Sequence, residues 1–162
     1  MILFEDTLWP LLHLKFVGEH TPAQYEEYLA KLEKSLRRPG PCLILADTNV
    51  AQSIPLAHCR RQVEWCREHE ALIREKVLGV AFVVTSTLAR LSLNIVVQLG
   101  PLPPYTFVSH ARAAGEWAAE RFSDVGLLQP SVRVRQHFGL RPVAAAAGAP
   151  WERAAHGEPL SS

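Results

Sequence analysis

The sequence predicts an α/β fold: a single domain built on a mixed sheet of about four to five strands with about four helices. Three observations favour it. Short runs rich in Val, Leu and Ile alternate with amphipathic segments long enough for helices. The runs at 42–46 and 78–85 are apolar throughout, which is typical of parallel strands covered on both faces. The first of them ends at Asp47-Thr48-Asn49, and open α/β sheets usually place their binding sites at that end of a strand.

Composition limits the possible functions. The chain has 162 residues, 48% of them hydrophobic and 20% charged, which suits one globular domain. A net charge of +1 gives no overall attraction to nucleic acid or to anionic lipid, so neither is an expected partner. The N-terminal segment carries Glu5 and Asp6 where a signal peptide would carry Lys or Arg, and no apolar run is long enough for membrane insertion. Three cysteines without a CxxC pair favour a reducing compartment, and we expect a cytoplasmic protein.

The first half of the chain predicts a strand pair, a helix and the central strand. Residues 2–4 and 9–17 suit a hairpin or an edge pair, because apolar and polar side chains alternate in the second run. The segment Thr-Pro-Ala-Gln at 21–24 is a capping box with proline at the first helical position, and an apolar stripe continues from it to Leu36. Residues 42–46 then form the central strand.

The next segment predicts one long helix, from a Ser53 cap to about Arg74. Its apolar positions recur at helical spacing and share one face; they are Leu56, Cys59, Val63, Cys66 and Ile73. Arg60, Arg67 and Arg74 share another face. That row is interpreted as a solvated face paired with Glu64 and Glu68, with contact to an acidic partner as the alternative.

A second buried strand, a third helix and a last strand follow at 78–85, 88–99 and 105–108. Ser86 or Thr87 caps the third helix, and Ser109 is expected to cap a fourth. Residues 132–138 suit either an edge strand or a short helix. The predicted organisation is a domain over 1–122, an extension packed on it over 123–140, and a mobile tail over 141–162.

This order of elements resembles the STAS-like superfamily, which includes bacterial anti-sigma factor antagonists and the cytoplasmic domains of sulphate transporters. The resemblance covers roughly residues 4–122, from the strand ending in Asp47 to the strand YTFVSH and its following helix. Within the superfamily the chain looks like the stand-alone bacterial proteins called STAS-like or STAS/SEC14-like. The resemblance implies a non-enzymatic interaction module in signalling or regulation, and Asp47 matches the acidic position of the family strand.

The resemblance also implies where a partner would bind: the loop after the central strand and the start of the next helix. We predict binding through Asp47, Thr48, Asn49 and Ser53, although these residue types also make turns and caps. Antagonists carry an Asp-Ser-Ser-Gly or Asp-Ser-Thr-Gly motif there and are switched by phosphorylation of a serine. Without gaps the motif falls on residues 55–58, which contain no hydroxyl, so only Ser53 remains as a possible phosphorylation site.

The third helix is the second predicted contact surface. Apolar residues surround most of it, so we expect its outer side to show some of them to a partner. The predicted contact residues are Arg90, Leu91, Leu93 and Val97. The partner is another protein or a second copy of the chain, as a homodimer. The alternative is that residues 127–140 cover this side.

Enzyme and metal motifs are absent from the sequence. His58, Cys59, Cys66 and His69 lack chelating spacing and are interpreted as packed thiols and surface histidines, so no metal and no cofactor are expected. No GxSxG, HExxH, phosphate-binding loop or dinucleotide fingerprint occurs. Two alternatives stay open: a carrier holding an apolar or nucleotide-like molecule beneath the link at 101–104, and a hydrolase or transferase without a familiar motif.

Overall fold

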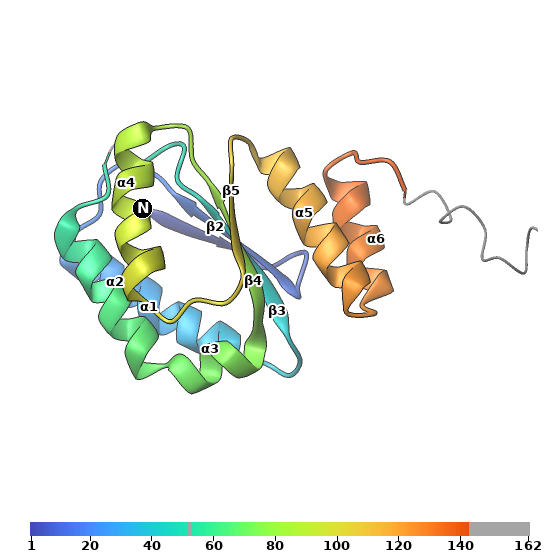
Figure 1. Cartoon of the computed structure of the whole chain (residues 1–162), viewed down its shortest axis with the longest axis horizontal. Coiled ribbons are helices and arrows are strands. Elements are labelled where there is room, and N and C mark those ends of the chain that lie inside the picture. Colours follow the sequence, from blue (N-terminus) through green and yellow to red (C-terminus); the bar gives the residue numbers. More distant parts are fainter. Residues whose placement is uncertain (52, 143–162) are drawn as a thin grey trace, which may run out of the picture.

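A computed structural model describes residues 1–51 and 53–142, which contain one five-stranded sheet and six helices (Figure 1). The strands are β1 (Ile2–Glu5), β2 (Leu11–Phe16), β3 (Cys42–Asp47), β4 (Val77–Val83) and β5 (Tyr105–Val108). The helices are α1 (Pro22–Leu36), α2 (Leu56–Glu68), α3 (Glu70–Lys76), α4 (Thr87–Leu99), α5 (Ala111–Asp124) and α6 (Leu128–His137). The predicted α/β class and mixed sheet are confirmed.

The strands lie in the order β1-β2-β3-β4-β5, so β3 is the central strand, as predicted. β1 pairs with β2 in antiparallel fashion, and the other three pairings are parallel. Side chains alternate between the two faces along β3: Ile44 and Ala46 enter the larger apolar core, whereas Leu43 and Leu45 enter the core on the opposite face. Burial on both faces explains why this strand is apolar throughout.

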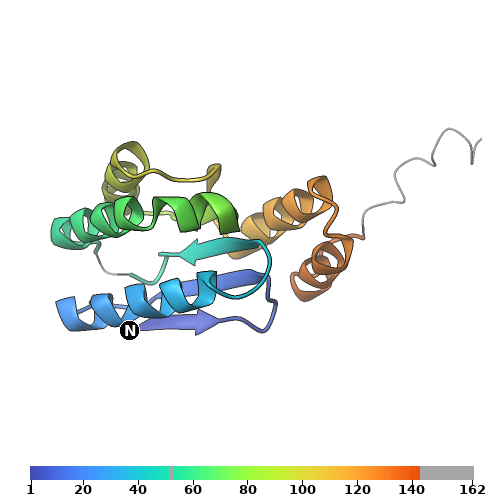
Figure 2. The same cartoon turned by 90° about the horizontal axis from the view of Figure 1, so that it is seen from below.

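Two groups of helices cover the two faces of the sheet. Helices α1 to α4 lie on one side and α5 and α6 on the other, as the two perpendicular views show (Figures 1 and 2). We call these sides the α4 face and the α5 face. Helix α4 packs mainly on α2, whereas α5 packs directly on β3 and β4.

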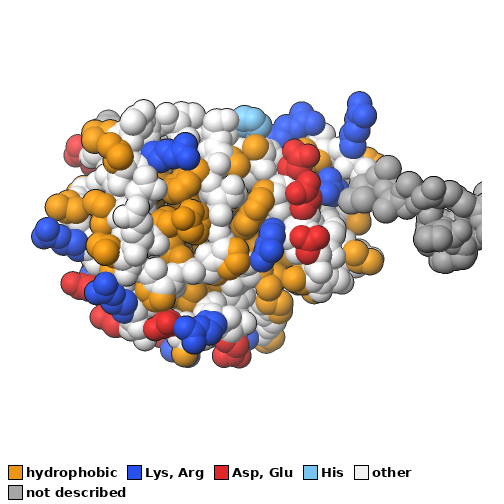
Figure 3. Space-filling model, in the orientation of Figure 1, with side chains coloured by type: hydrophobic (Ala, Val, Ile, Leu, Met, Phe, Trp, Pro, Cys, Tyr) orange, Lys and Arg blue, Asp and Glu red, His pale blue; other side chains and the backbone are white. Residues whose placement is uncertain are grey.

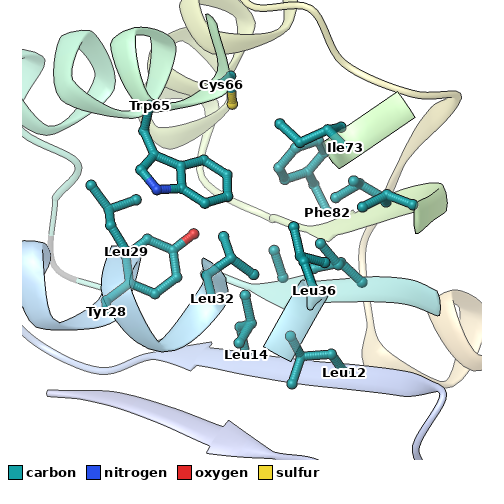
Figure 4. Packing of buried hydrophobic residues seen from close by; sticks show 14 of the residues in the cluster. Leu12, Leu14, Tyr28, Leu29, Leu32, Leu36, Trp65, Cys66, Ile73 and Phe82 are labelled. Atoms are coloured by element: carbon teal, nitrogen blue, oxygen red, sulfur yellow. The ribbon is translucent and has the colours of Figure 1, made fainter. Parts of the chain in front are cut away.

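The core of the α4 face is rich in aromatic and large aliphatic side chains. Tyr28 on α1 and Trp65 on α2 point toward Leu14 and Phe82 of the sheet (Figure 4). The core of the α5 face contains smaller groups. Its helix contributes Ala114, Ala118 and Ala119, each no more than 1% exposed, around the fully buried Phe122.

On the α5 face, two aromatic rings pack directly against glycine. A Cβ atom at Gly115 of α5 would lie 2.6 Å from Cγ of Phe138, and one at Gly79 of β4 would lie 3.3 Å from Cζ2 of Trp117. Real Cβ contacts are rarely so short, so both glycines permit an aromatic ring to approach the backbone. This face is therefore packed close to its limit.

The predicted helix starts are partly right. Thr21 caps α1, and Gln24 completes the capping box, as predicted. Ser86 caps α4 by accepting a hydrogen bond from the backbone N–H of Ala89. The predicted Ser109 cap is wrong: α5 begins after His110, whose Nδ1 accepts from the backbone N–H of Ala113 at 3.1 Å.

The long helix predicted after β3 is two helices with a later start. Ser53 caps nothing, because α2 begins at Leu56 with Pro55 at the capping position. Proline disfavours helical geometry in the residue before it, which accounts for the later start. The helix breaks at His69, whose φ and ψ are −111° and 22°. Leu56, predicted to face the core, is 48% exposed.

The segment after α5 forms a short helix, α6, which is one of the two predicted alternatives. Ser131 of α6 donates to the carbonyl of Ala119, and Val134 is fully buried on the α5 face. The segment therefore lies across the sheet from α4. The proposal that residues 127–140 cover α4 is wrong for this reason. Most of the predicted tail, from residue 143 onward, lies outside the described residues.

Candidate functional site

The polar residues that follow β3 hydrogen-bond mainly within the protein. The Asp47 carboxylate accepts from the backbone N–H of Asn49 at 3.0 Å, and the buried Thr48 hydroxyl donates to the carbonyl of Val83 at 2.9 Å. The Asn49 side chain donates to the carbonyl of Ser109 and accepts from the Thr85 hydroxyl. These bonds tie the turn after β3 to the ends of β4 and β5. The three residues therefore make the turn, the role given above as the alternative to binding.

Ser53 differs from the other predicted loop residues. Its side chain is exposed and lies at the rim of a cavity described below. No hydrogen bond to its hydroxyl is present among the described residues. The binding roles of Asp47, Thr48 and Asn49 and the phosphorylation of Ser53 stay predictions. Asn49 and Ser53 are the exposed residues of the four, and Asn49 is held by hydrogen bonds.

Helix α4 has two apolar stripes on different sides. The inner one contains Leu93 and Val96, which are 8% and 5% exposed. The outer one contains Leu88, Leu91 and Leu99, which are 69%, 59% and 56% exposed. Three leucines more than half exposed on one helix make an unusual surface, since apolar side chains of this size are mostly buried. We call these three residues the outer leucines.

The structure changes part of the predicted contact set on α4. The predicted exposure of Leu93 is wrong, because the side chain packs in the core, and Val97 is only partly exposed and packs against it. Arg90 and Leu91 are exposed, as predicted. The Arg90 guanidinium lies over the ring of Phe107 on β5, 4.9 Å from its centre. Because apolar residues occur nearly all round α4, the sequence alone could not tell which leucines face the core and which face outward.

Basic residues of α2 lie beside the outer leucines. Arg67 donates to the carbonyl of Leu99, which places it at the end of α4, and Arg60 lies two turns earlier on the same side of α2. The predicted pairing of this row with Glu64 and Glu68 is wrong. Both glutamates lie instead within 4 Å of Arg61, at 3.9 and 3.6 Å, and Arg61 also pairs with Glu26 at 2.6 Å.

A cavity of about 100 Å³ lies inside the α4 face, between the sheet and helices α1, α2 and α4. Leu14, Tyr28, Trp65, Phe82, Leu93 and Val96 are among its walls, several of them visible in Figure 4. At one end it reaches the loop at Ser53 and at the other Leu102 and Pro103. The link at 101–104 also borders a second depression, of about 300 Å³, beside Glu70 and Arg74, so the predicted place for a ligand adjoins both.

A polar cluster in the cavity wall was missed by sequence reasoning. The hydroxyls of Tyr25 and Tyr28 donate to Oε1 of Gln62 at 2.8 and 3.2 Å, and Gln62 Nε2 lies 3.6 Å from Sγ of Cys66. The ring of His58 stacks on Tyr25 with centroids 4.4 Å apart. His58, Gln62 and Cys66 are four residues apart, a spacing that could have revealed a common helix face.

The cysteines and histidines give no sign of metal or thiol chemistry. All three thiols are free and buried, and burial raises the pKa of Cys59, Cys66 and Cys42, the last to about 12. A protonated thiol is a poor nucleophile and metal ligand. Within residues 1–51 and 53–142, no group of three metal-ligating side chains occurs. His58, predicted to be on the surface, is buried.

A second polar group, also missed, lies on the α5 face. Nδ1 of the buried His13 lies 3.4 Å from Oε2 of Glu5, and Lys15 Nζ lies 3.2 Å from the other oxygen of that carboxylate. Burial lowers the pKa of His13, and the positive charge of Lys15 lowers it further. The cluster joins the edge strand β1 to its neighbour β2, and no cavity adjoins it among those described.

Comparison with solved structures identifies the fold. The chain is similar to the crystal structure of an uncharacterised protein of the DUF3478 family from Shewanella loihica PV-4, described as having a SpoIIAA-like fold. The match has a TM-score of 0.54 and 20% identity, and covers 73% of this chain and 92% of that one. The protein has a SpoIIAA-like fold. No family model and no curated protein matches the chain.

The comparison confirms the STAS-like resemblance at the level of the fold. The similar protein is itself uncharacterised, so the likeness carries no partner or activity. No helix of the described residues is long and apolar enough to cross a membrane.

Proposed function

We propose that this protein is a non-catalytic regulatory module that acts by binding another protein through the outer face of α4. The exposure of the outer leucines carries the proposal. Each would gain free energy by leaving water, about 25 cal/mol for every Å² of apolar surface buried. Helix α6, which the alternative interpretation placed over them, lies on the α5 face instead.

Charge indicates the chemistry of the partner. Arg90 on α4 and Arg60 and Arg67 on α2 are exposed on the two helices that carry this surface, and Arg67 reaches the carbonyl of Leu99. None of the three forms an ion pair within the described residues. Figure 3 shows a basic side chain beside the apolar surface near α4, a row of acidic side chains over α5, and both kinds of charge elsewhere on this view. A partner segment with apolar residues flanked by acids would complement this surface.

The same charges disfavour a homodimer through α4. A two-fold contact is formed by the same patch on both copies. Packing α4 against α4 would therefore bring two sets of three arginines together, and like charges across an interface are costly. A partner other than a second copy is the better match.

The proposed setting is the cytoplasm. Three buried free thiols suit a reducing compartment, because oxidising compartments favour disulfides in proteins of this size. The raised thiol pKa values and the internally bonded loop support a binding role over catalysis.

The test compares exposed leucines on α4 with an exposed leucine on α6, in the full chain. Tagged wild-type protein, the Leu88→Glu/Leu91→Glu double variant and the matched control Leu128→Glu are used to capture partners from cells that produce the protein. Leu128 is 64% exposed on α6, so all three substituted side chains start from similar exposure. Thermal unfolding verifies that each variant is folded.

We expect a stoichiometric protein bound by wild type and Leu128→Glu and lost from the double variant, with no change in unfolding temperature beyond about 2 °C. A partner retained equally by all three proteins would contradict the proposal. So would a wild-type protein that sediments as a dimer and becomes monomeric in the double variant, or one recovered with lipid vesicles alone.

A further inference from the structure

We propose that the cavity of the α4 face is a binding site for a small, uncharged, mainly apolar molecule that carries one hydrogen-bond acceptor. This inference is independent of the proposed contact through α4. It rests on the volume of the cavity, the chemistry of its walls and the spare hydrogen-bond donor of Gln62.

The volume sets the size of the ligand. Protein interiors are close-packed, with few voids larger than a water molecule. A cavity of about 100 Å³ is therefore a specific feature of this core. An apolar cavity of about 150 Å³ stays dry and accepts benzene. A single ring of five or six atoms, or a short branched chain, is the corresponding size class.

The walls exclude a charged ligand. No Asp, Glu, Lys or Arg is among the described residues that line the cavity. Its two histidines, His20 and His58, both have a pKa lowered by burial, so they are neutral at pH 7. A buried charge without a partner carries a large desolvation penalty. Phosphates and carboxylates are therefore excluded from this cavity.

Gln62 supplies the polar contact. Its Oε1 already accepts from two tyrosine hydroxyls, whose raised pKa values keep them protonated. Its Nε2 has only the sulfur of Cys66, at 3.6 Å, as a partner among the described residues. Sulfur is a weak acceptor, and an amide nitrogen offers two donors. A carbonyl, ether or hydroxyl oxygen on the ligand would satisfy the spare donor.

Binding is reversible and leaves the ligand unchanged. The two thiols in the wall, Cys59 and Cys66, have pKa values raised by burial and stay protonated. They are therefore poor nucleophiles toward a bound carbonyl. The site holds a molecule by packing and one hydrogen bond.

The experiment is a titration of the full chain followed by methyl NMR. Cyclohexanone is the neutral probe with an acceptor, methylcyclohexane is the probe without one, and cyclohexanecarboxylate is the charged probe. We expect saturable shifts for cyclohexanone at methyls of Leu93 and Val96 in the wall, and none at Leu11 and Val134 on the α5 face. Methylcyclohexane should shift the same methyls, because burial of its apolar surface favours binding without a hydrogen bond.

Two variants separate binding from folding. Cys59→Leu adds volume inside the cavity and should abolish the shifts, with retained folding verified by its spectrum. Gln62→Leu removes the donor and should weaken cyclohexanone binding about three- to tenfold, the value of one hydrogen bond, without weakening that of methylcyclohexane. Absence of saturable shifts with both neutral probes would overturn the inference. Equal binding of the carboxylate, or full binding by a folded Cys59→Leu, would also overturn it.

Discussion

The two faces of the sheet differ in how completely they are filled. The α5 face is packed with small residues and two aromatic rings that approach glycine, and its central Phe122 is fully buried. The α4 face contains a cavity, a polar cluster and a helix with leucines exposed on its far side. Close packing specifies a stable structure, whereas cavities and exposed apolar groups are features that bind other molecules. We infer that stability is concentrated on the α5 face and binding on the α4 face.

The largest effect on stability is expected from creating a cavity in the core of the α5 face. Phe122→Ala removes a fully buried aromatic side chain and should lower the free energy of unfolding by about 3–5 kcal/mol. Chemical denaturation measures the change. The control Leu88→Ala, at a residue 69% exposed, should change it by less than about 0.5 kcal/mol. Similar losses of unfolding free energy in Phe122→Ala and Leu88→Ala would contradict the proposed difference between the two faces.

A matched pair of alanines compares the two faces directly. Ala46 on β3 lines the cavity, and Ala81 on the neighbouring strand β4 lies in the α5-face core. Ala81→Val should destabilise by about 1–3 kcal/mol, because the added methyls have no space. Ala46→Val should be neutral or stabilise by about 0.5–2 kcal/mol, because it fills a void.

Strand propensity favours valine at both positions, so it cancels from the comparison. Equal destabilisation by the two substitutions, measured by the same denaturation experiment, would show that the α4 face has no more free space than the α5 face.

Much of the fold could be predicted because it depends on local signals. The capping box at Thr21 and Gln24 uses contacts within four residues, and the apolar run of β3 reports burial on both faces. The phase of α4 could not be predicted, because apolar residues surround the helix. The packing of α4 on α2 and on the core of the sheet determines that Leu93 faces inward and Leu91 outward.

The cavity and its polar cluster depend on tertiary packing and had no sequence signal of their own. Gln62 meets Tyr25 and Tyr28 from a different helix, 37 and 34 residues away in the chain. His58 becomes buried through its stacking on Tyr25. A cavity forms where side chains from distant parts of the chain leave space unfilled, and a sequence pattern does not predict this.

A smaller effect concerns pH on the α5 face. The pKa of His13 is lowered by burial, so the folded state favours the neutral ring. Above pH about 6.5, the ordinary pKa of histidine, both states are neutral and stability is complete. As the pH falls from there toward the lower folded pKa, the unfolded chain takes up a proton first and stability is lost.

His13→Asn should flatten this loss between about pH 6.5 and pH 5. Denaturation midpoints of the two proteins, measured across that range, provide the test. Parallel curves would show that His13 does not contribute to the acid sensitivity.

The contrast between the faces is tested most directly by hydrogen exchange of the protein with its captured partner bound. The account predicts added protection of backbone amides in α4, residues 87–99, and at the adjoining turns of α2, with α5 and α6 unchanged. Protection confined to residues 111–137, or absent from α4, would contradict it and place the contact surface on the other side of the sheet.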